Sequence, residues 1–403
     1  MDNEHISQIE ENSYPLYFGG LIMALVFFLL EETMIDLPDE VNLLLKLTAF
    51  LLLSLHILSA FSEYTTLWKV IIVVTFVLSV IVGVKCDHFT QLYVTWAAVF
   101  GAKGIPRDKL LSVYFKASFL FCVMTVCMAL LGIIENKFYY NLSGTRENIF
   151  GEVVKGRGCY GYVWPTDFAT HVFFICMTYW MLKDGVLSVT KSFLILLMTY
   201  FLLLYTDSRL GCGCIILLLL CGGVLYIFKK RKDGKVVEYN RPRLSFLFVL
   251  WIPFLAFLSL WATAAYEPTN LTWIAVDLIL SGRLDYGQEA LSNYGIPLLG
   301  QLYRLQGGES DANMYNYIDS SYLQLFIIYG LCYTLLILIA YCILGYRSYL
   351  RRNYVILTAL FVAGISGAIA QHFIQFFMNP LLLLLFTKDE KLLCQNRIQE
   401  YED

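Results

Sequence analysis

The sequence predicts an all-α, polytopic integral membrane protein, a helical bundle of about 12 transmembrane helices with two long extracytoplasmic loops. Only 15% of the 403 residues are charged, against about 25% in an average soluble domain. Apolar and aromatic residues make up 58% of the chain. They form long uninterrupted runs, such as 193–205 and 214–228, and such runs are typical of membrane spans.

Windows of about 16 to 24 apolar residues define the candidate spans, which together form a single transmembrane domain over residues 1–403. The fourth, seventh and twelfth windows are short. The windows are 15–32, 42–60, 68–84, 88–103, 111–134, 167–183, 192–206, 210–228, 244–265, 320–345, 354–371 and 373–387.

The distribution of lysine and arginine orients these spans. With the N-terminus inside, 20 of the 29 basic residues lie on the inner side, as the positive-inside rule requires. The inner loop 229–243 is strongly basic and suits contact with lipid headgroups. The acidic opening of the chain lacks the positive segment of a cleavable signal peptide.

Two outer segments, 135–166 and 266–319, are too long to be simple connections, and loops of that length usually carry function. The second contains a pattern typical of a short amphipathic helix. We expect that helix to begin after Ser281 as N-cap and to end at 293–295.

Several functional classes lack support in the sequence. The net charge of −3 gives no electrostatic basis for binding nucleic acid. The 11 cysteines lie mostly in apolar runs, without the spacing of a zinc site. No phosphate-binding loop of the GxxxxGK[ST] type occurs, and no soluble domain carries a DxD-like metal site. We therefore expect no metal or cofactor, and a driving force from an activated lipid-linked substrate or a gradient.

Three arginines next to glycine-containing segments lie on the side with fewer basic residues. They are Arg157, Arg209 and Arg283, each in a different outer segment. Guanidinium groups bind phosphate oxygens in bidentate fashion, and glycine lets backbone N–H groups approach. The three together favour a diphosphate ligand. For Arg209 alone, the simpler interpretation is a turn stabilised by an Asp207–Arg209 pair.

Aromatic and ionisable residues of the outer side complete the candidate site. Tyr160 and Tyr286 lie in the long outer segments, where aromatic rings stack on sugars or form an interfacial belt. Glycosyl transfer needs a base for the acceptor hydroxyl. Asp167, Asp319 and His372 are the candidates, and His171 is four residues from Asp167 on one helical face. Each of them also suits a capping or buried hydrogen-bonding role.

Four patches in this order resemble the bacterial polysaccharide polymerase and O-antigen ligase family, which includes the Wzy-type polymerases of O-antigen and capsule. The resemblance covers about residues 150 to 385. Leu210 replaces the threonine of the family pattern and Ser320 replaces its asparagine, so two of its hydrogen-bonding positions are unmatched. The patches are RGCYGY at 157–162 before Thr166-Asp167, DSRLG at 207–211, SGRL at 281–284 followed by PLLG at 297–300, and DSSYL at 319–323 followed by Tyr329-Gly330.

The resemblance implies a fold like that of the GT-C glycosyltransferases and a metal-independent, inverting transfer of an oligosaccharide from undecaprenyl diphosphate. It places the reaction at the outer, periplasmic face of the bacterial plasma membrane. The implied partners are an undecaprenyl-diphosphate-linked oligosaccharide, the lipid bilayer, a flippase and a chain-length regulator, with no nucleic acid. The candidate catalytic residues are Arg209, Arg283, His372, Asp319 and Asp167, and the candidate substrate-binding residues are Arg157, Arg304, Tyr160, Tyr286 and Tyr322.

Three alternatives stay open. An O-antigen ligase would attach finished glycan to a different acceptor, and ligases of this group use a histidine near the final outer loops, which His372 matches. A transporter or flippase of lipid-linked sugars would need ionisable groups near mid-membrane, where His56 is the main candidate. A sensor or scaffold would leave the two long outer loops unexplained.

Overall fold

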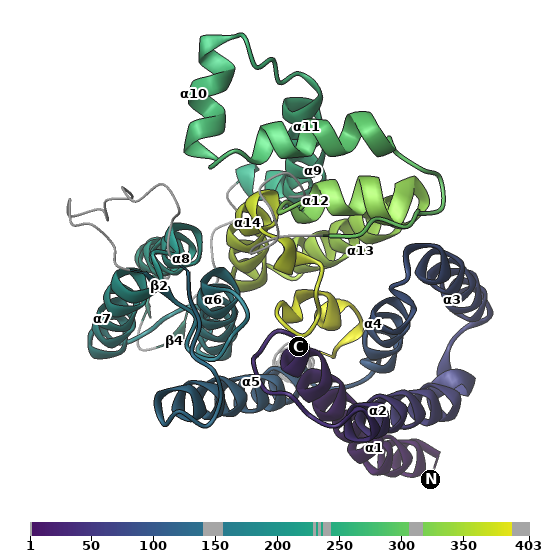
Figure 1. The fold of residues 1–403 in the computed structure, drawn as a ribbon. Helices are drawn as coiled ribbons and strands as arrows, with labels where there is room; N and C mark the ends of the chain where they lie inside the picture. Colours follow the sequence, from purple (N-terminus) through teal and green to yellow (C-terminus); the bar gives the residue numbers. More distant parts are fainter. Residues whose placement is uncertain are drawn as a thin grey trace. The chain divides into compact units, whose positions relative to one another are not determined.

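The computed structural model describes most of the chain, and regular structure in the described residues is almost entirely helical (Figure 1). The described residues are 2–139, 156–228, 231–232, 235–236, 243–305 and 317–388. The chain divides into two compact units, of which the first comprises 1–63, 97–239 and 383–403 and the second comprises 64–96 and 240–382. Parts of both long outer segments and most of the basic segment 229–243 lie outside the described residues.

The first unit is a group of long helices. α1 packs closely along α2, and Gly20 permits this approach because it has no Cβ. A Cβ at this position would lie only 2.8 Å from Leu53 Cγ. α6 is mostly buried, since it contacts α5, α7 and α8. The elements are α1 (Asp2–Glu31), α2 (Asp39–Ala60), α5 (Arg107–Leu130), α6 (Pro165–Leu182), α7 (Val189–Thr206), α8 (Arg209–Phe228), and the antiparallel strand pairs β1 (Phe138–Tyr139) with β2 (Arg157–Gly158) and β3 (Arg231–Lys232) with β4 (Lys235–Val236).

The second unit is centred on α9, which contacts α11, α12, α13 and α14. Gly364 lets the Trp251 ring lie against α14, and the Trp251 Nε1–H donates to the Phe361 carbonyl oxygen at 3.1 Å. Its elements are α3 (Thr66–Cys86), the 3-10 helix η2 (Arg243–Val249), α9 (Trp251–Ala264), α10 (Leu271–Ile279), α11 (Arg283–Tyr294), α12 (Ser321–Gln324), the π-helix η4 (Leu325–Tyr329), α13 (Gly330–Leu350) and α14 (Tyr354–Ile369), while α4 (Phe89–Gly101) has residues in both units.

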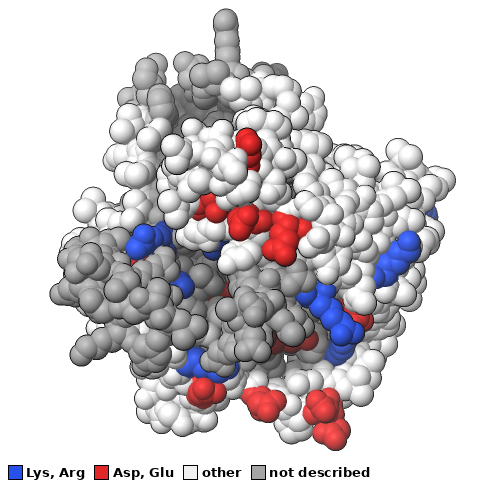
Figure 2. Space-filling model, turned by 45° about the horizontal axis from the view of Figure 1, so that its top comes forward, with Lys and Arg blue, Asp and Glu red and all other residues white. Residues whose placement is uncertain are grey.

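Within the described residues, seven helices are long and apolar enough to cross a membrane. Among the residues that Figure 2 describes, uncharged ones prevail and the charged side chains gather in a few groups, which agrees with this. The protein is therefore a helical membrane protein, and the number twelve stays a prediction. The seven are Tyr14–Glu31, Asp39–Ser59, Thr66–Cys86, Arg107–Leu130, Val189–Thr206, Arg209–Ile227 and Ser321–Leu350.

The expected twelfth helix over 373–387 is not formed. The segment instead contains a 3-10 helix, η6 (Pro380–Phe386). Pro380 has no N–H to donate. The Asn379 side chain donates to the Phe373 carbonyl at 2.8 Å and accepts from the Leu381 N–H at 3.2 Å, so it competes with helical hydrogen bonding. The segment is apolar because it is buried. Composition alone does not distinguish such a buried segment from a membrane-spanning helix.

The long helix Ser321–Leu350 is broken where the outer loop meets it. The N–H groups of Leu331 and Cys332 donate to the carbonyl oxygens of Pro297 and Leu298 at 2.9 and 3.1 Å, and the Gln301 N–H donates to that of Ile328 at 2.9 Å. The loop backbone thus provides hydrogen-bond partners for backbone N–H and C=O groups that lack helical partners at the π-helix η4. Inside a membrane protein such backbone groups need partners from the protein itself.

Gly330→Ala is expected to destabilise the protein by about 2 kcal/mol or more, because a side chain is costly at this position. Gly330 has a φ of 81°, and a Cβ there would lie in van der Waals overlap with the backbone nitrogen of Gly300. Gly213→Ala is the matched control, since a Cβ on Gly213 meets nothing within 4 Å. The apparent melting temperature in detergent should fall only for the first variant, and equal melting temperatures would contradict the expectation.

Candidate functional site

The turn before α11 sets the position of Arg283. Ser281 and Gly282 both have positive φ, 61° and 82°, and the Gly282 N–H donates to the Asp277 carbonyl oxygen at 2.9 Å. The Asp277 carboxylate accepts the Leu284 N–H at 2.8 Å. Asp277 therefore caps the helix across the turn. The predicted helix is confirmed, but the predicted cap is wrong, because Gly282 occupies the N-cap position and Ser281 lies one residue before it.

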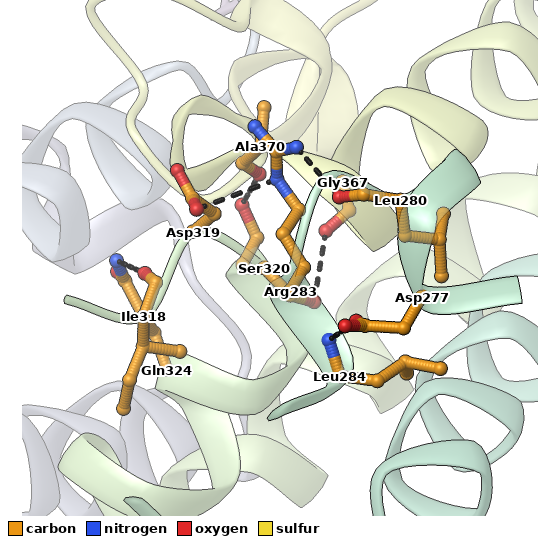
Figure 3. A network of polar contacts seen from close by, with 11 residues as sticks. Asp277, Leu280, Arg283, Leu284, Ile318, Asp319, Ser320, Gln324, Gly367 and Ala370 are labelled. Carbon is orange, nitrogen blue, oxygen red and sulfur yellow. Dashed lines mark hydrogen bonds and ion pairs between the residues drawn. The ribbon is translucent and has the colours of Figure 1, made fainter. Parts of the chain in front are cut away.

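Arg283 contacts an acidic residue from a distant part of the chain, as Figure 3 shows. Its Nε lies 3.4 Å from Asp319 Oδ2, as an ion pair without hydrogen-bond geometry. Its Nη1 donates to the Leu280 carbonyl oxygen at 2.8 Å. Both side chains are about a quarter exposed, at 25% and 28%. In the part of the chain that the structure describes, the Nη2 group donates no hydrogen bond, so its two N–H groups could donate to an anion.

The start of α12 links Asp319 to the segment that carries His372. Ser320 is the N-cap, and its hydroxyl oxygen accepts from the Leu323 N–H. The Ser321 hydroxyl donates to the Ala370 carbonyl oxygen and accepts the Phe373 N–H at 3.2 Å. Ser321 is fully buried, so these contacts fix the chain on both sides of His372.

His372 has the surroundings of an oriented imidazole. It is 2% exposed, and its Nδ1 lies 2.7 Å from Gln375 Oε1. Because an amide oxygen only accepts, Nδ1 carries the proton and Nε2 has the lone pair in the neutral ring. An imidazole held in this tautomer can accept a proton from a hydroxyl group.

Arg157 lies at the turn between α7 and α8, in the first unit. Its Nε donates to the Thr206 carbonyl oxygen at 2.9 Å, across 49 residues of sequence. In the same turn Asp207 has a φ of 47°, and its carboxylate lies 3.4 Å from the half-exposed Arg209. The Asp207–Arg209 pair expected for a simple turn is thus present, together with a second guanidinium group.

Tyr160 borders the same turn. Its N–H donates to Asn136 Oδ1 at 2.9 Å, and its ring centroid lies 6.3 Å from that of Tyr205. Burial raises the pKa of Tyr160, and Tyr205 raises it further. The phenol is therefore neutral at physiological pH, and it offers a ring face and a hydroxyl.

The Cys159 thiol is expected to resist alkylation at pH 8. Burial, and then the Asp167 carboxylate, raise its pKa to about 12, so about one molecule in 10⁴ carries the reactive thiolate at that pH. Mass spectrometry after iodoacetamide treatment should find the residue unmodified in the folded protein and modified in sodium dodecyl sulfate. Modification should become measurable only as the pH rises toward 12, and equal modification in both states at pH 8 would contradict this.

Asp167 and His171 lie inside the first unit. They are 2% and 0% exposed. His171 Nδ1 lies 2.7 Å from the hydroxyl of Tyr162, which is also fully buried. These positions suit structural hydrogen bonding as well as they suit catalysis.

The remaining candidates differ in exposure. Tyr322 is fully buried and donates its hydroxyl hydrogen to the Gly364 carbonyl oxygen at 3.0 Å, which is a packing position. Tyr286 is 40% exposed on α11, one turn after Gly282. Arg304 is exposed at the end of the described part of its loop.

The predicted residues therefore fall into two groups. Arg283 and Asp319 are paired in the second unit, where His372 lies on the segment bound by Ser321, and Arg157, Arg209 and Tyr160 lie in the first unit. Convergence of all three arginines on one diphosphate stays a prediction. Asp277 and Gln375 were missed by sequence reasoning, because only the fold places a carboxylate at the start of α11 and an amide at His372.

No group of three potential metal ligands occurs among the described residues. The expectation that the protein needs no metal or cofactor stays a prediction. Comparison of the chain with models of protein families, with curated proteins and with solved structures gave no match.

Proposed function

We propose that this protein is a membrane glycosyltransferase that joins undecaprenyl-diphosphate-linked oligosaccharides into polysaccharide at the outer face of the bacterial plasma membrane. The proposal rests on the four sequence patches described above and on one structural observation. Arg283 and Asp319 form an ion pair, and Ser321, two residues after Asp319, hydrogen-bonds the backbone on both sides of His372, so three distant segments form one group. That group contains the two chemical functions that the reaction needs, an anion-binding cation and a base.

The proposed reaction is a single inverting displacement. The acceptor sugar hydroxyl attacks the anomeric carbon of the donor, and its proton passes to His372 Nε2, while Gln375 holds the Nδ1–H. The bond between the anomeric carbon and the diphosphate oxygen breaks, and that oxygen keeps the electron pair. Arg283 stabilises the departing lipid diphosphate through its N–H groups.

Asp319 has two roles in this scheme. Its carboxylate keeps the Arg283 guanidinium in place in the absence of substrate. The contact is an ion pair without a hydrogen bond, so a diphosphate can add to the guanidinium without breaking a strong interaction. If His372 is not the base, Asp319 is the second candidate, because its carboxylate contacts Arg283.

The test is a reconstituted polymerisation. The purified protein in nanodiscs is supplied with undecaprenyl-diphosphate repeat units isolated from its own host after deletion of the gene, and the products are separated on a gel. A ladder of increasing length supports the proposal. Absence of any product longer than one repeat unit, with correctly folded protein and intact substrate, would refute it.

An O-antigen ligase is the second candidate, because an oriented histidine near the end of the chain also suits that reaction. The same assay distinguishes the two. A ligase transfers glycan only when a separate acceptor, such as the lipid A core, is supplied, whereas a polymerase needs repeat units alone.

A further inference from the structure

A long apolar groove runs along the helices of the first unit. It has a volume of about 770 Å³ and is lined by residues of α5, α6 and α7, together with Tyr160. This volume lies within the about 300–1,000 Å³ typical of ligand sites. These three helices, drawn in Figure 1, belong to the first unit, and α6 contacts both others.

The groove extends along most of α7. Lys191 and Thr206 line its two ends, and fifteen residues of α-helix between them correspond to about 22 Å. Small or flexible side chains such as Cys122, Val172 and Met198 line the part between. Lys191 is the one charged residue among the described lining residues, so the groove suits a hydrocarbon chain.

The end at Thr206 is different, because it meets the arginines of the candidate site. Arg157 donates to the Thr206 carbonyl oxygen at 2.9 Å, and Arg209 follows in the next turn with a half-exposed side chain. Tyr160 and Tyr205 also line this end. An apolar groove with the Arg157 guanidinium bound at its Thr206 end, and Arg209 three residues further along the chain, matches a lipid with one chain and an anionic headgroup.

We infer that this groove holds the isoprenoid chain of the acceptor, a polyprenyl diphosphate, with its diphosphate at Arg157 and Arg209, while the donor diphosphate lies at Arg283 as proposed above. The inference rests on the proposed function for the identity of the lipid, and it adds the location of the chain. A charge-assisted contact holds the headgroup, and van der Waals packing against the groove side chains positions the hydrocarbon chain. The chain lies along α7 from Thr206 toward Lys191.

The experiment is photocrosslinking with a diazirine-bearing polyprenyl diphosphate in phosphatidylcholine nanodiscs, followed by peptide mapping. The adducts are expected on α5, α6 and α7. Unlabelled polyprenyl diphosphate should compete, while phosphatidylglycerol and the headless polyprenol should compete at least tenfold less well. Met198→Trp, which fills the groove, should lower the yield about tenfold. The matched control, Leu197→Trp, lies on the same helix outside the groove lining and should leave the yield unchanged.

Arg157→Ala gives a second variant that leaves the groove open. In this variant the tenfold advantage of the diphosphate over the polyprenol in competition should become smaller, because only Arg209 remains to bind the headgroup. Adducts spread evenly over all spans, equal competition by phosphatidylglycerol, or equal effects of the two tryptophan variants would overturn the inference.

Combining this experiment with the polymerisation assay separates the two proposals. Adducts in the groove without a product ladder would leave the lipid site in place and refute the polymerase. A product ladder with adducts elsewhere would leave the polymerase in place and refute the lipid site.

Discussion

Arg283→Ala is expected to slow chain extension about 10²- to 10³-fold in the reconstituted assay, the loss typical of removing one donor that stabilises developing negative charge. The fold should persist, because the cap of α11 uses the backbone N–H of Leu284 and the carboxylate of Asp277. The arginine side chain is a quarter exposed, so its truncation leaves no large cavity.

Two further variants sharpen this prediction. Arg283→Lys keeps the charge but loses the planar fork, and we expect it to recover only part of the rate. Arg351→Ala removes an exposed arginine just after the C-terminal end of α13 and should extend chains normally. Polymer of full length at the normal rate from Arg283→Ala would rule out a role for this guanidinium group in the reaction.

His372→Gln is expected to reduce the rate about 10²- to 10⁴-fold, the range that a positioned general base contributes. Glutamine keeps a polar side chain at this buried position but cannot accept the proton at neutral pH. Binding of the lipid-linked substrate, measured by the photocrosslinking yield, should not change. Thermal unfolding of the variant must match that of the wild type, and normal turnover by a correctly folded variant would exclude His372 as the base.

Gln375 provides an independent readout of the same assignment, as a positioning residue. Gln375→Glu places a carboxylate where the amide oxygen contacts Nδ1. A neighbouring negative charge favours the protonated imidazole, so the acidic limb of the pH–rate profile should move to higher pH. A fall in rate without any movement of that limb would show that Gln375 has only a structural role, and His372 would then need another orienting partner.

The sequence predicted the spans where an apolar run is bounded by polar residues. The windows 42–60 and 210–228 agree with α2 (Asp39–Ala60) and α8 (Arg209–Phe228) within three residues. The prediction of spans fails where a segment is apolar for a reason other than crossing the membrane. Segment 373–387 is buried, and Asn379 and Pro380 give it 3-10 structure. The helix α10 was not predicted, because its nine residues are fewer than the window used to find spans.

The site was predicted in part for a similar reason. Arginine next to glycine, and histidine or aspartate at a span end, are local patterns that the sequence displays. The Arg283–Asp319 contact joins residues that are far apart in the chain, and the Gln375 contact depends on the turn after Phe373. The first contact follows from how α11 packs against the start of α12, and the second is local but depends on a turn where the sequence predicted a helix from residue 373.

The hydrogen bonds from the Pro297–Gln301 backbone to the broken helix affect how the candidate site is assembled. They tether the chain between Arg283 and Asp319 at an intermediate point, so the loop that carries the arginine has far fewer conformations than its length would allow. The conformational entropy of bringing cation and carboxylate together is thus lost when the protein folds. A substrate that binds there meets a preorganised pair, and its binding energy remains for the transition state.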